Sequence, residues 1–136
     1  IVESDRLESN LRKILNLGHT IGHAIESHSH ISNNIDQLKH GEAIIIGLIS
    51  ELYISSKLLG YPIDKVDKFK KTCNMYFKKI NIKEDDYDEI YALMSYDKKN
   101  IQSNINFVLL DNLGKVVIDQ KVSQKEFIES LDYYNS

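Results

Sequence analysis

The segment from His40 to Leu59 constrains the fold more than any other part of the chain. It reads HGEAIIIGLISELYISSKLL, and its apolar residues would cover most of the circumference of an α-helix: Ile44, Ile45, Ile46, Leu48, Ile49, Leu52 and Ile54. A helix that is apolar nearly all round is stable only when it is buried on most sides. The sequence therefore predicts a fold built around this helix, which stops before Gly60 and Pro62.

Further helices are predicted on both sides of the central one. They cover about residues 9–28, 64–79 and 84–96. The stretch 28–38 reads as a polar connection in which His28 and His30 face solvent. The helix over 64–79 is expected to bury one side, formed by Val66, Phe69, Cys73, Tyr76 and Phe77.

The end of the chain predicts a hairpin and one more helix. Residues 105–110 and 115–118 read as two strands joined by a turn with Gly114. Ser123, followed three residues later by Glu126, is a capping box for a last helix that ends near Tyr134. The expected fold class is mainly α: a multihelical domain with one small β-hairpin.

Length and composition fit one ordinary globular domain. The chain has 136 residues, 42% hydrophobic and 27% charged, which is enough to bury a real core. A net charge of -3 argues against nucleic acid as a partner, and the longest apolar run, 43–49, is too short to span a bilayer. The single cysteine excludes an internal disulfide and fits a reducing compartment, so we expect a cytoplasmic protein.

Four polar side chains share one stripe of the first predicted helix. Arg12, Asn16, His19 and His23 follow at i, i+4, i+7 and i+11, within an arc of about 60°. Solvated helix faces usually carry Lys, Glu and Gln. A guanidinium, a carboxamide and two imidazoles suit anion recognition and metal binding better, although Arg12 alone also fits a surface salt bridge.

His19 and His40 are the predicted metal pair. Neutral imidazole is a good zinc ligand, and His40 opens a predicted helix, where the dipole disfavours imidazolium. A catalytic zinc usually has three protein ligands. Glu26 and Glu42 are local candidates for the third, although Glu42 also fits a first-turn carboxylate that complements the dipole. A core or surface role for these histidines is the alternative.

His23 lies one turn beyond His19 and faces the same space. It could be a second ligand or a group that transfers protons beside the metal, and a hydrogen-bonded interfacial histidine is the alternative. Gly18 and Gly22 lie beside the stripe, and each costs about 1 kcal/mol of helix propensity relative to Ala. Another backbone or a ligand is therefore expected to approach closely there, and a simple helix–helix crossing is the alternative.

Lys98 and Lys99 follow the helix predicted over 84–96. Adjacent lysines are usually solvated, but they can also cap an anion site as point charges. The sequence has no Gly-rich strand–turn–helix motif for a dinucleotide and nothing like a Ser/His/Asp triad or a glycosidase pair of carboxylates.

Several strings resemble one enzyme family. LRKILNLGHTIGHAIES, HGEAIIIGL, DKKN and INFVLL are similar to the C-terminal domain of 3-dehydroquinate synthases, members of the sugar-phosphate cyclase group. The resemblance implies conversion of 3-deoxy-D-arabino-heptulosonate 7-phosphate to 3-dehydroquinate and phosphate. This lyase reaction belongs to the shikimate pathway of aromatic amino acid biosynthesis. The family uses NAD+ and a divalent metal, zinc or cobalt.

The resemblance also implies roles for individual residues. His19 and His40 match the metal ligands, and His23 matches a residue that touches substrate beside the metal and takes part in catalysis. The remaining side chains match substrate-binding positions: Arg12, Asn16, Lys98 and Lys99. Of the two lysines, also candidates for catalysis, one is expected to reach the substrate.

Residues 1–136 are expected to form a single helical C-terminal domain. In the family, a glutamate that is the third metal ligand and most of the NAD+ site belong to an N-terminal domain that this sequence lacks. We therefore expect this chain to be a fragment of a longer, homodimeric enzyme. Alone, the fragment is expected to be inactive and to bind zinc weakly. A processed or trimmed small protein is the alternative.

Three other functions fit less of the sequence. Another sugar-phosphate cyclase and a metal-dependent polyol dehydrogenase are the enzymatic alternatives. Arg12 together with the two lysines favours a doubly anionic substrate over a neutral polyol. A non-catalytic helical binding module is the alternative of a different class, and a dinucleotide-binding turn upstream would argue against it.

Overall fold

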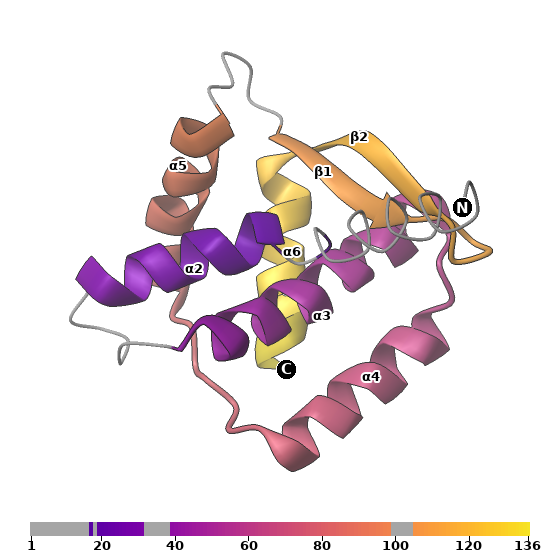
Figure 1. Ribbon diagram of the computed structural model, residues 1–136, viewed down its shortest axis with the longest axis horizontal. Helices are drawn as coiled ribbons and strands as arrows, with labels where there is room; N and C mark the ends of the chain where they lie inside the picture. The colour runs from indigo at the N-terminus through magenta and orange to yellow at the C-terminus, as the bar shows by residue number, and fades with distance from the viewer. Residues whose placement is uncertain (1–16, 18, 32–38, 99–104) are drawn as a thin grey trace, which may run out of the picture.

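The long helix α3 (His40–Leu59) runs through the middle of the molecule, as predicted (Figure 1). The computed structural model describes residues 17, 19–31, 39–98 and 105–136. Around α3 lie α2 (His19–Ile31), α4 (Ile63–Tyr76), the short 3-10 helix η1 (Glu84–Asp86), α5 (Tyr87–Lys98) and α6 (Gln124–Asn135). The class is the predicted one: mainly helical, with one β-hairpin in the described residues.

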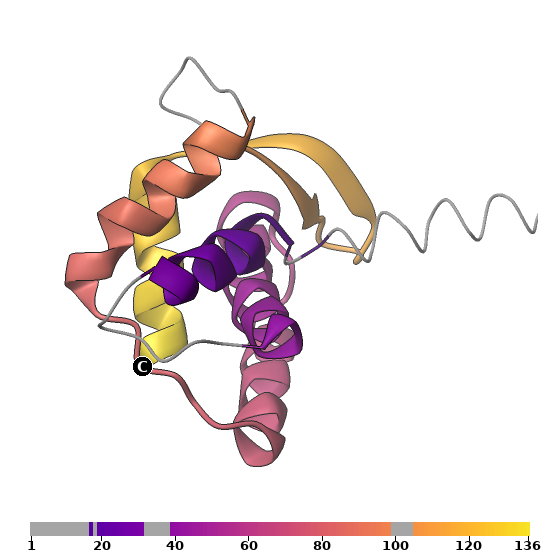
Figure 2. The ribbon, with the colours of Figure 1, turned by 60° about the vertical axis from the view of Figure 1, so that its left-hand side comes forward.

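The core lies where α2, α3, α5 and α6 meet. α2 packs between α3 and α5, and α6 packs against α3 and α5 (Figure 2). Fully buried aliphatic and aromatic side chains fill this space: Ile21, Ile25, Ile46, Ile49, Ile54, Ile90, Met94 and Phe127. Burial of this apolar surface, at about 25 cal/mol per Å², stabilises the packing of α2 on α3.

The hairpin closes one end of this core. β1 (Ile105–Leu110) and β2 (Val116–Val122) are antiparallel and pair Leu110 with Val116 and Ile105 with Val122. The turn is held by the Asp111 side chain, which accepts hydrogen bonds from the backbone N–H groups of Leu113 and Lys115. β2 is longer than the predicted 115–118 because its further residues complete the ladder with β1.

Helix ends follow local sequence signals. Gly60, at φ 77°, ends α3 in the left-handed conformation that favours glycine. The predicted Ser123–Glu126 capping box is present at the start of α6. α2 continues to Ile31, three residues past the predicted end at His28, and its predicted start at residue 9 or 10 lies outside the described residues.

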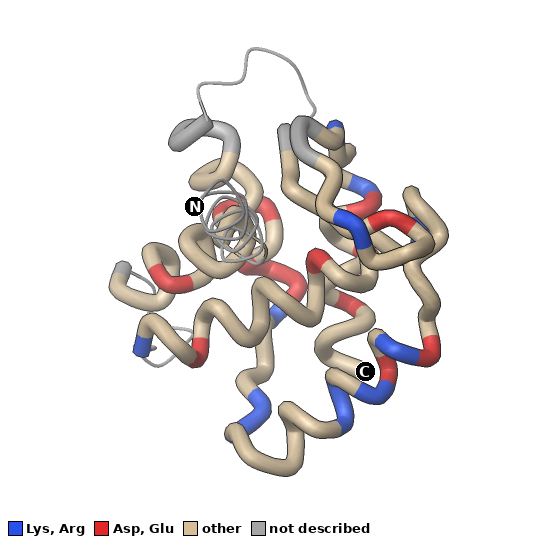
Figure 3. The backbone as a smooth tube through the Cα atoms, turned by 45° about the vertical axis from the view of Figure 1, so that its right-hand side comes forward, with Lys and Arg blue, Asp and Glu red and all other residues tan. Residues whose placement is uncertain are grey.

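α4 departs from the expected burial at its end. Val66 and Cys73 are buried, but Tyr76 is 75% exposed and Phe77 is 49% exposed, so the prediction that these aromatic residues face inward was wrong. The helix ends at Tyr76, and Figures 1 and 2 show this end lying away from the core helices. Lysines and aspartates are interspersed along α4 (Figure 3).

No helix in the described part of the chain combines the length and apolar character needed to cross a bilayer.

Candidate functional site

α2 and α3 cross at Gly22. A Cβ atom at this position would lie 3.1 Å from the Ala43 carbonyl oxygen and 3.2 Å from the Ile44 Cα atom. Optimal non-bonded contacts are about 3.5–4.0 Å, so a larger residue does not fit without movement of backbone. The close approach predicted at Gly22 is therefore made by another helix; Gly18 lies outside the described residues.

This crossing brings three imidazoles together. The ring centroids of His19 and His23, both on α2, are 5.9 Å apart. The His40 ring, at the first residue of α3, lies 5.9 Å from His19 and 6.1 Å from His23. His19 is half-buried, His23 is exposed and the His40 side chain is 56% exposed. The three rings thus form a cluster that is partly open to solvent.

The two local glutamates have different partners. Glu26 Oε1 lies 3.0 Å from His40 Nδ1, whereas Glu42 accepts a hydrogen bond from the backbone N–H of Lys39 at 2.9 Å. Glu42 therefore matches the alternative interpretation, a first-turn carboxylate at the start of α3. Glu26, seven residues after His19 on α2, belongs to the histidine cluster.

The surroundings of His19 favour its neutral imidazole. Partial burial lowers the pKa of His19, and positive charge on His23 or His40 lowers it further. The hydrogen bond with His40 lowers the pKa of the Glu26 carboxyl group, which favours its ionised form. Only an unprotonated ring nitrogen has a lone pair for a metal, so His19 is biased toward the form that binds one.

The donor set fits a divalent transition metal. Imidazole nitrogen suits zinc and cobalt, and the described residues offer three imidazoles from two helices at one place. The ring nitrogens of the three histidines do not all lie within 4.8 Å of one another, so the side chains would have to rotate to share one ion.

A buried carboxylate, not singled out in the sequence, holds the start of α2. Glu51 of α3 is fully buried, and its Oε2 atom accepts a hydrogen bond from the backbone N–H of Ile21 at 3.1 Å. N–H groups in the first turn of a helix have no partner within the helix. The sequence does contain an indication of this role, because Glu51 is a lone acidic residue in the apolar part of its segment.

The other predicted site residues lie outside the part of the chain whose side chains the structure describes. Arg12, Asn16 and Lys99 lie outside the described residues. Lys98 is the last residue of α5, and its side chain also lies outside the description. The anion-binding part of the site stays a prediction.

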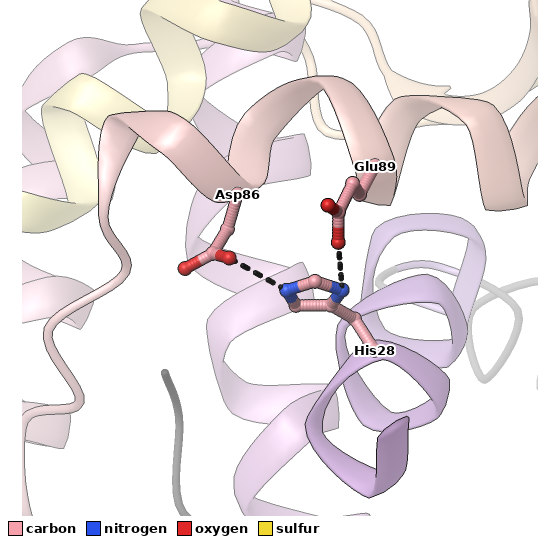
Figure 4. A group of neighbouring side chains, drawn as sticks. All are labelled: His28, Asp86 and Glu89. Carbon is pink, nitrogen blue, oxygen red and sulfur yellow. Dashed lines mark hydrogen bonds and ion pairs between the residues drawn. The ribbon is translucent and has the colours of Figure 1, made fainter. Parts of the chain in front are cut away.

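The position of His28 differs from the prediction that this side chain faces solvent. It is fully buried, whereas His30 is exposed as predicted. Because α2 continues to Ile31, His28 points at α5 instead of lying in a loop. Its Nε2 atom lies 2.9 Å from Asp86 Oδ1 and its Nδ1 atom 3.4 Å from Glu89 Oε2 (Figure 4).

The spacing of this second cluster would also allow a metal, since one ligand atom from each of His28, Asp86 and Glu89 lies within 4.8 Å of the others. Both ring nitrogens already face a carboxylate, however, and only Glu89 is exposed. We interpret the cluster as a polar contact that links α2 to η1 and the start of α5.

Sequence comparison places the chain among known enzymes. A family model described as 3-dehydroquinate synthase C-terminal matches residues 1–100. The 3-dehydroquinate synthase of Parabacteroides distasonis is 45% identical over 98% of this chain and 37% of its own length. That of Staphylococcus carnosus is 34% identical over 98% of this chain and 36% of its own length. The chain thus spans little more than a third of these relatives.

Solved structures agree with the sequence comparison. A structure of 2-deoxy-scyllo-inosose synthase is similar with a TM-score of 0.66 and 25% identity, over 88% of this chain and 32% of that one. The same enzyme complexed with carbaglucose-6-phosphate, NAD+ and Co2+ gives a TM-score of 0.68 and 27% identity, over 87% and 34%. With the family model matching residues 1–100, these findings show that the chain belongs to the 3-dehydroquinate synthase C-terminal family.

Proposed function

We propose that this chain is the metal- and substrate-binding part of a 3-dehydroquinate synthase. The complete protein would convert 3-deoxy-D-arabino-heptulosonate 7-phosphate to 3-dehydroquinate and phosphate. The observation that carries the proposal is the meeting of His19, His23 and His40 at one solvent-facing place, in a chain of this family.

His19 and His40 would hold the metal, which we expect to be zinc or cobalt. A divalent metal bound there supplies Lewis-acid polarisation of substrate oxygens. The chain's contribution is to present two imidazoles from helices that cross closely at Gly22. Such preorganisation reduces the reorganisation required when substrate binds.

His23 would act beside the metal. It is exposed, and it lies one turn after His19 on α2. Histidine is the side chain whose ordinary pKa suits proton transfer near neutral pH. We assign His23 the role of contacting substrate and of holding or moving a proton at one of its ring nitrogens.

The anionic groups of the substrate would be bound by the predicted basic and amide residues. Arg12 supplies a planar guanidinium for bidentate binding of a carboxylate or phosphate, and Asn16 hydrogen-bonds hydroxyl groups. Lys98 and Lys99 supply point charges, one of them contacting substrate. A seven-carbon sugar acid phosphate carries both a carboxylate and a phosphate, which matches this surplus of positive charge.

The remaining parts of the site would come from the rest of the protein. An N-terminal domain would bind NAD+ and supply a glutamate as the third metal ligand. We expect a homodimer in the cytoplasm. On its own the chain would be inactive and would bind zinc weakly, because two ligands leave the coordination shell incomplete.

Another sugar-phosphate cyclase is the second candidate. The solved structures similar to this chain are of 2-deoxy-scyllo-inosose synthase, one of them with carbaglucose-6-phosphate, which supports a phosphorylated cyclic or open sugar as an alternative substrate. A polyol dehydrogenase would accept a substrate without phosphate, and a helical binding module would turn over neither.

One assay separates these functions. The complete protein is incubated with the heptulosonate phosphate, NAD+ and zinc, and phosphate release is measured before and after chelation of the metal. Release that requires NAD+ and stops on chelation is expected. NAD+ binding without phosphate release would contradict the synthase function, and a panel of sugar phosphates and polyols would then identify the substrate class.

A further inference from the structure

Glu26 occupies a position from which it can control the His40 ring. Its Oε1 atom lies 3.0 Å from His40 Nδ1, across the gap between α2 and α3. An ionised carboxylate only accepts hydrogen bonds, so the proton of this contact has to be on Nδ1. A neutral His40 ring then carries its lone pair on Nε2, on the other side of the ring from Glu26.

Packing alone does not fix this ring. The His40 side chain is 56% exposed and sits on the first residue of α3, whereas the Glu26 side chain is 22% exposed. An exposed imidazole is free to rotate and to exchange its proton between the two nitrogens. Among the described residues, the hydrogen bond with Glu26 is the contact that would select one tautomer and one orientation.

Glu42 does not provide the same function, although it is only two residues from His40. Its carboxylate accepts a hydrogen bond from the backbone N–H of Lys39, with an N···O distance of 2.9 Å. The chain thus carries two carboxylates near one histidine, one engaged with the ring and the other with the helix start. This pair allows a matched experiment.

We propose that Glu26 is a positioning residue, which holds the His40 imidazole as the Nδ1–H tautomer and directs Nε2 toward the metal. The inference rests on the proposed metal site and assigns Glu26 a place behind His40 instead of a place among the ligands. Carboxylate partners of this kind fix ring orientation and raise the basicity of metal-bound histidines. Their removal typically weakens metal binding about 10- to 100-fold.

The first test needs no metal. In the metal-free complete protein with 15N-labelled histidine, long-range 1H–15N correlations report which ring nitrogen of His40 carries the proton. We expect the Nδ1–H tautomer in the parent protein and a loss of this preference in Glu26→Ala. The Nε2–H tautomer in the parent protein would overturn the proposal.

The second test measures metal affinity and ligand field. Zinc affinity is determined by competition with a chromophoric chelator, and the visible spectrum of the Co2+ form is recorded. Glu26→Ala should bind zinc about 10- to 100-fold more weakly while Co2+ keeps the same ligands. Glu26→Gln, whose amide oxygen still accepts a hydrogen bond, should lose less affinity, and Glu42→Gln should bind zinc as the parent does.

The variants also separate this inference from the function it depends on. If His19→Ala and His40→Ala leave zinc affinity unchanged, the proposed metal site is wrong. If they abolish binding while Glu26→Ala binds like the parent, only the positioning role is wrong. A Co2+ spectrum in Glu26→Gln that reports a lost ligand would make Glu26 a direct ligand, which also contradicts the proposal.

Discussion

Gly22 of α2 lies against the backbone of Ala43 in α3, so closely that a Cβ atom on Gly22 would be 3.1 Å from the Ala43 carbonyl oxygen. This contact fixes how the histidines of α2 approach the first residue of α3. The geometry of the candidate metal site therefore depends on a residue that carries no functional group.

Gly22→Ala is expected to destabilise the protein. The substitution gains about 1 kcal/mol of helix propensity, but overpacking against a backbone typically costs about 1–3 kcal/mol, so we expect a net loss of about 1 kcal/mol. Urea unfolding followed by circular dichroism measures the change. Gly41→Ala is the matched control, because a Cβ there would meet nothing within 4 Å. Equal effects of the two substitutions would contradict the tight crossing.

Glu51 is expected to stabilise the start of α2 from within the core. In Glu51→Ala the buried N–H of Ile21 loses its acceptor, and an unsatisfied buried donor costs about 1–3 kcal/mol. Glu51→Gln keeps an acceptor and should lose less. Denaturant unfolding of the two variants gives the comparison. If Glu51→Ala is as stable as the parent protein, the hydrogen bond does not hold the helix.

The contribution of each carboxylate that faces His28 to the stability of the protein should depend on how deeply that carboxylate is buried. Asp86 is 2% exposed and Glu89 is 68% exposed, although both face the same imidazole. Leaving a buried polar group without its partner costs about 1–3 kcal/mol, so Asp86→Asn and His28→Ala should be destabilising. Glu89→Gln should change the free energy of unfolding by less than about 1 kcal/mol. A larger loss in Glu89→Gln than in Asp86→Asn would reverse this assignment.

Tyr87 should make the protein sensitive to alkali. Burial raises the pKa of its hydroxyl group to about 12, and the hydrogen bond to Asp132 contributes to the rise. The folded state thus holds the Tyr87 proton more tightly than the unfolded state, whose tyrosine pKa is about 10. This contribution to stability is fully present below pH 10 and is lost between about pH 10 and 12.

Alkaline unfolding of Tyr87→Phe checks this prediction. The variant should be less sensitive than the parent protein across this pH range, whereas Tyr76→Phe, which changes a side chain that is 75% exposed, should behave as the parent does. Identical profiles of the parent protein and Tyr87→Phe would show that Tyr87 does not contribute.

Much of the fold follows from local patterns in the sequence. The apolar run after His40, the stop at Gly60 and the capping box at Ser123 each act within a few residues, and the structure has them where the sequence predicts. Tyr76 and Phe77 were misplaced for a different reason. Periodicity places them on the inner side of a longer helix, but α4 ends at Tyr76, away from the core.

The candidate site was predictable only in part. The spacing of His19 and His23 places them on one helix face, and the structure brings His40 beside them. The partners of His28 and Glu51 depend on how α2 lies against α5 and α3, which no pattern within one segment contains. His28 is 58 residues from Asp86 in sequence, so its burial could not be read from its polar neighbours.

His19 and His40 are expected to bind the same metal ion. Diffraction from crystals of the complete protein soaked with Co2+, with data collected at the cobalt absorption edge, tests this most directly. We predict an anomalous peak about 2.0–2.2 Å from one ring nitrogen of each of these two histidines. A peak at His28, Asp86 and Glu89, with none beside His19 and His40, would contradict it.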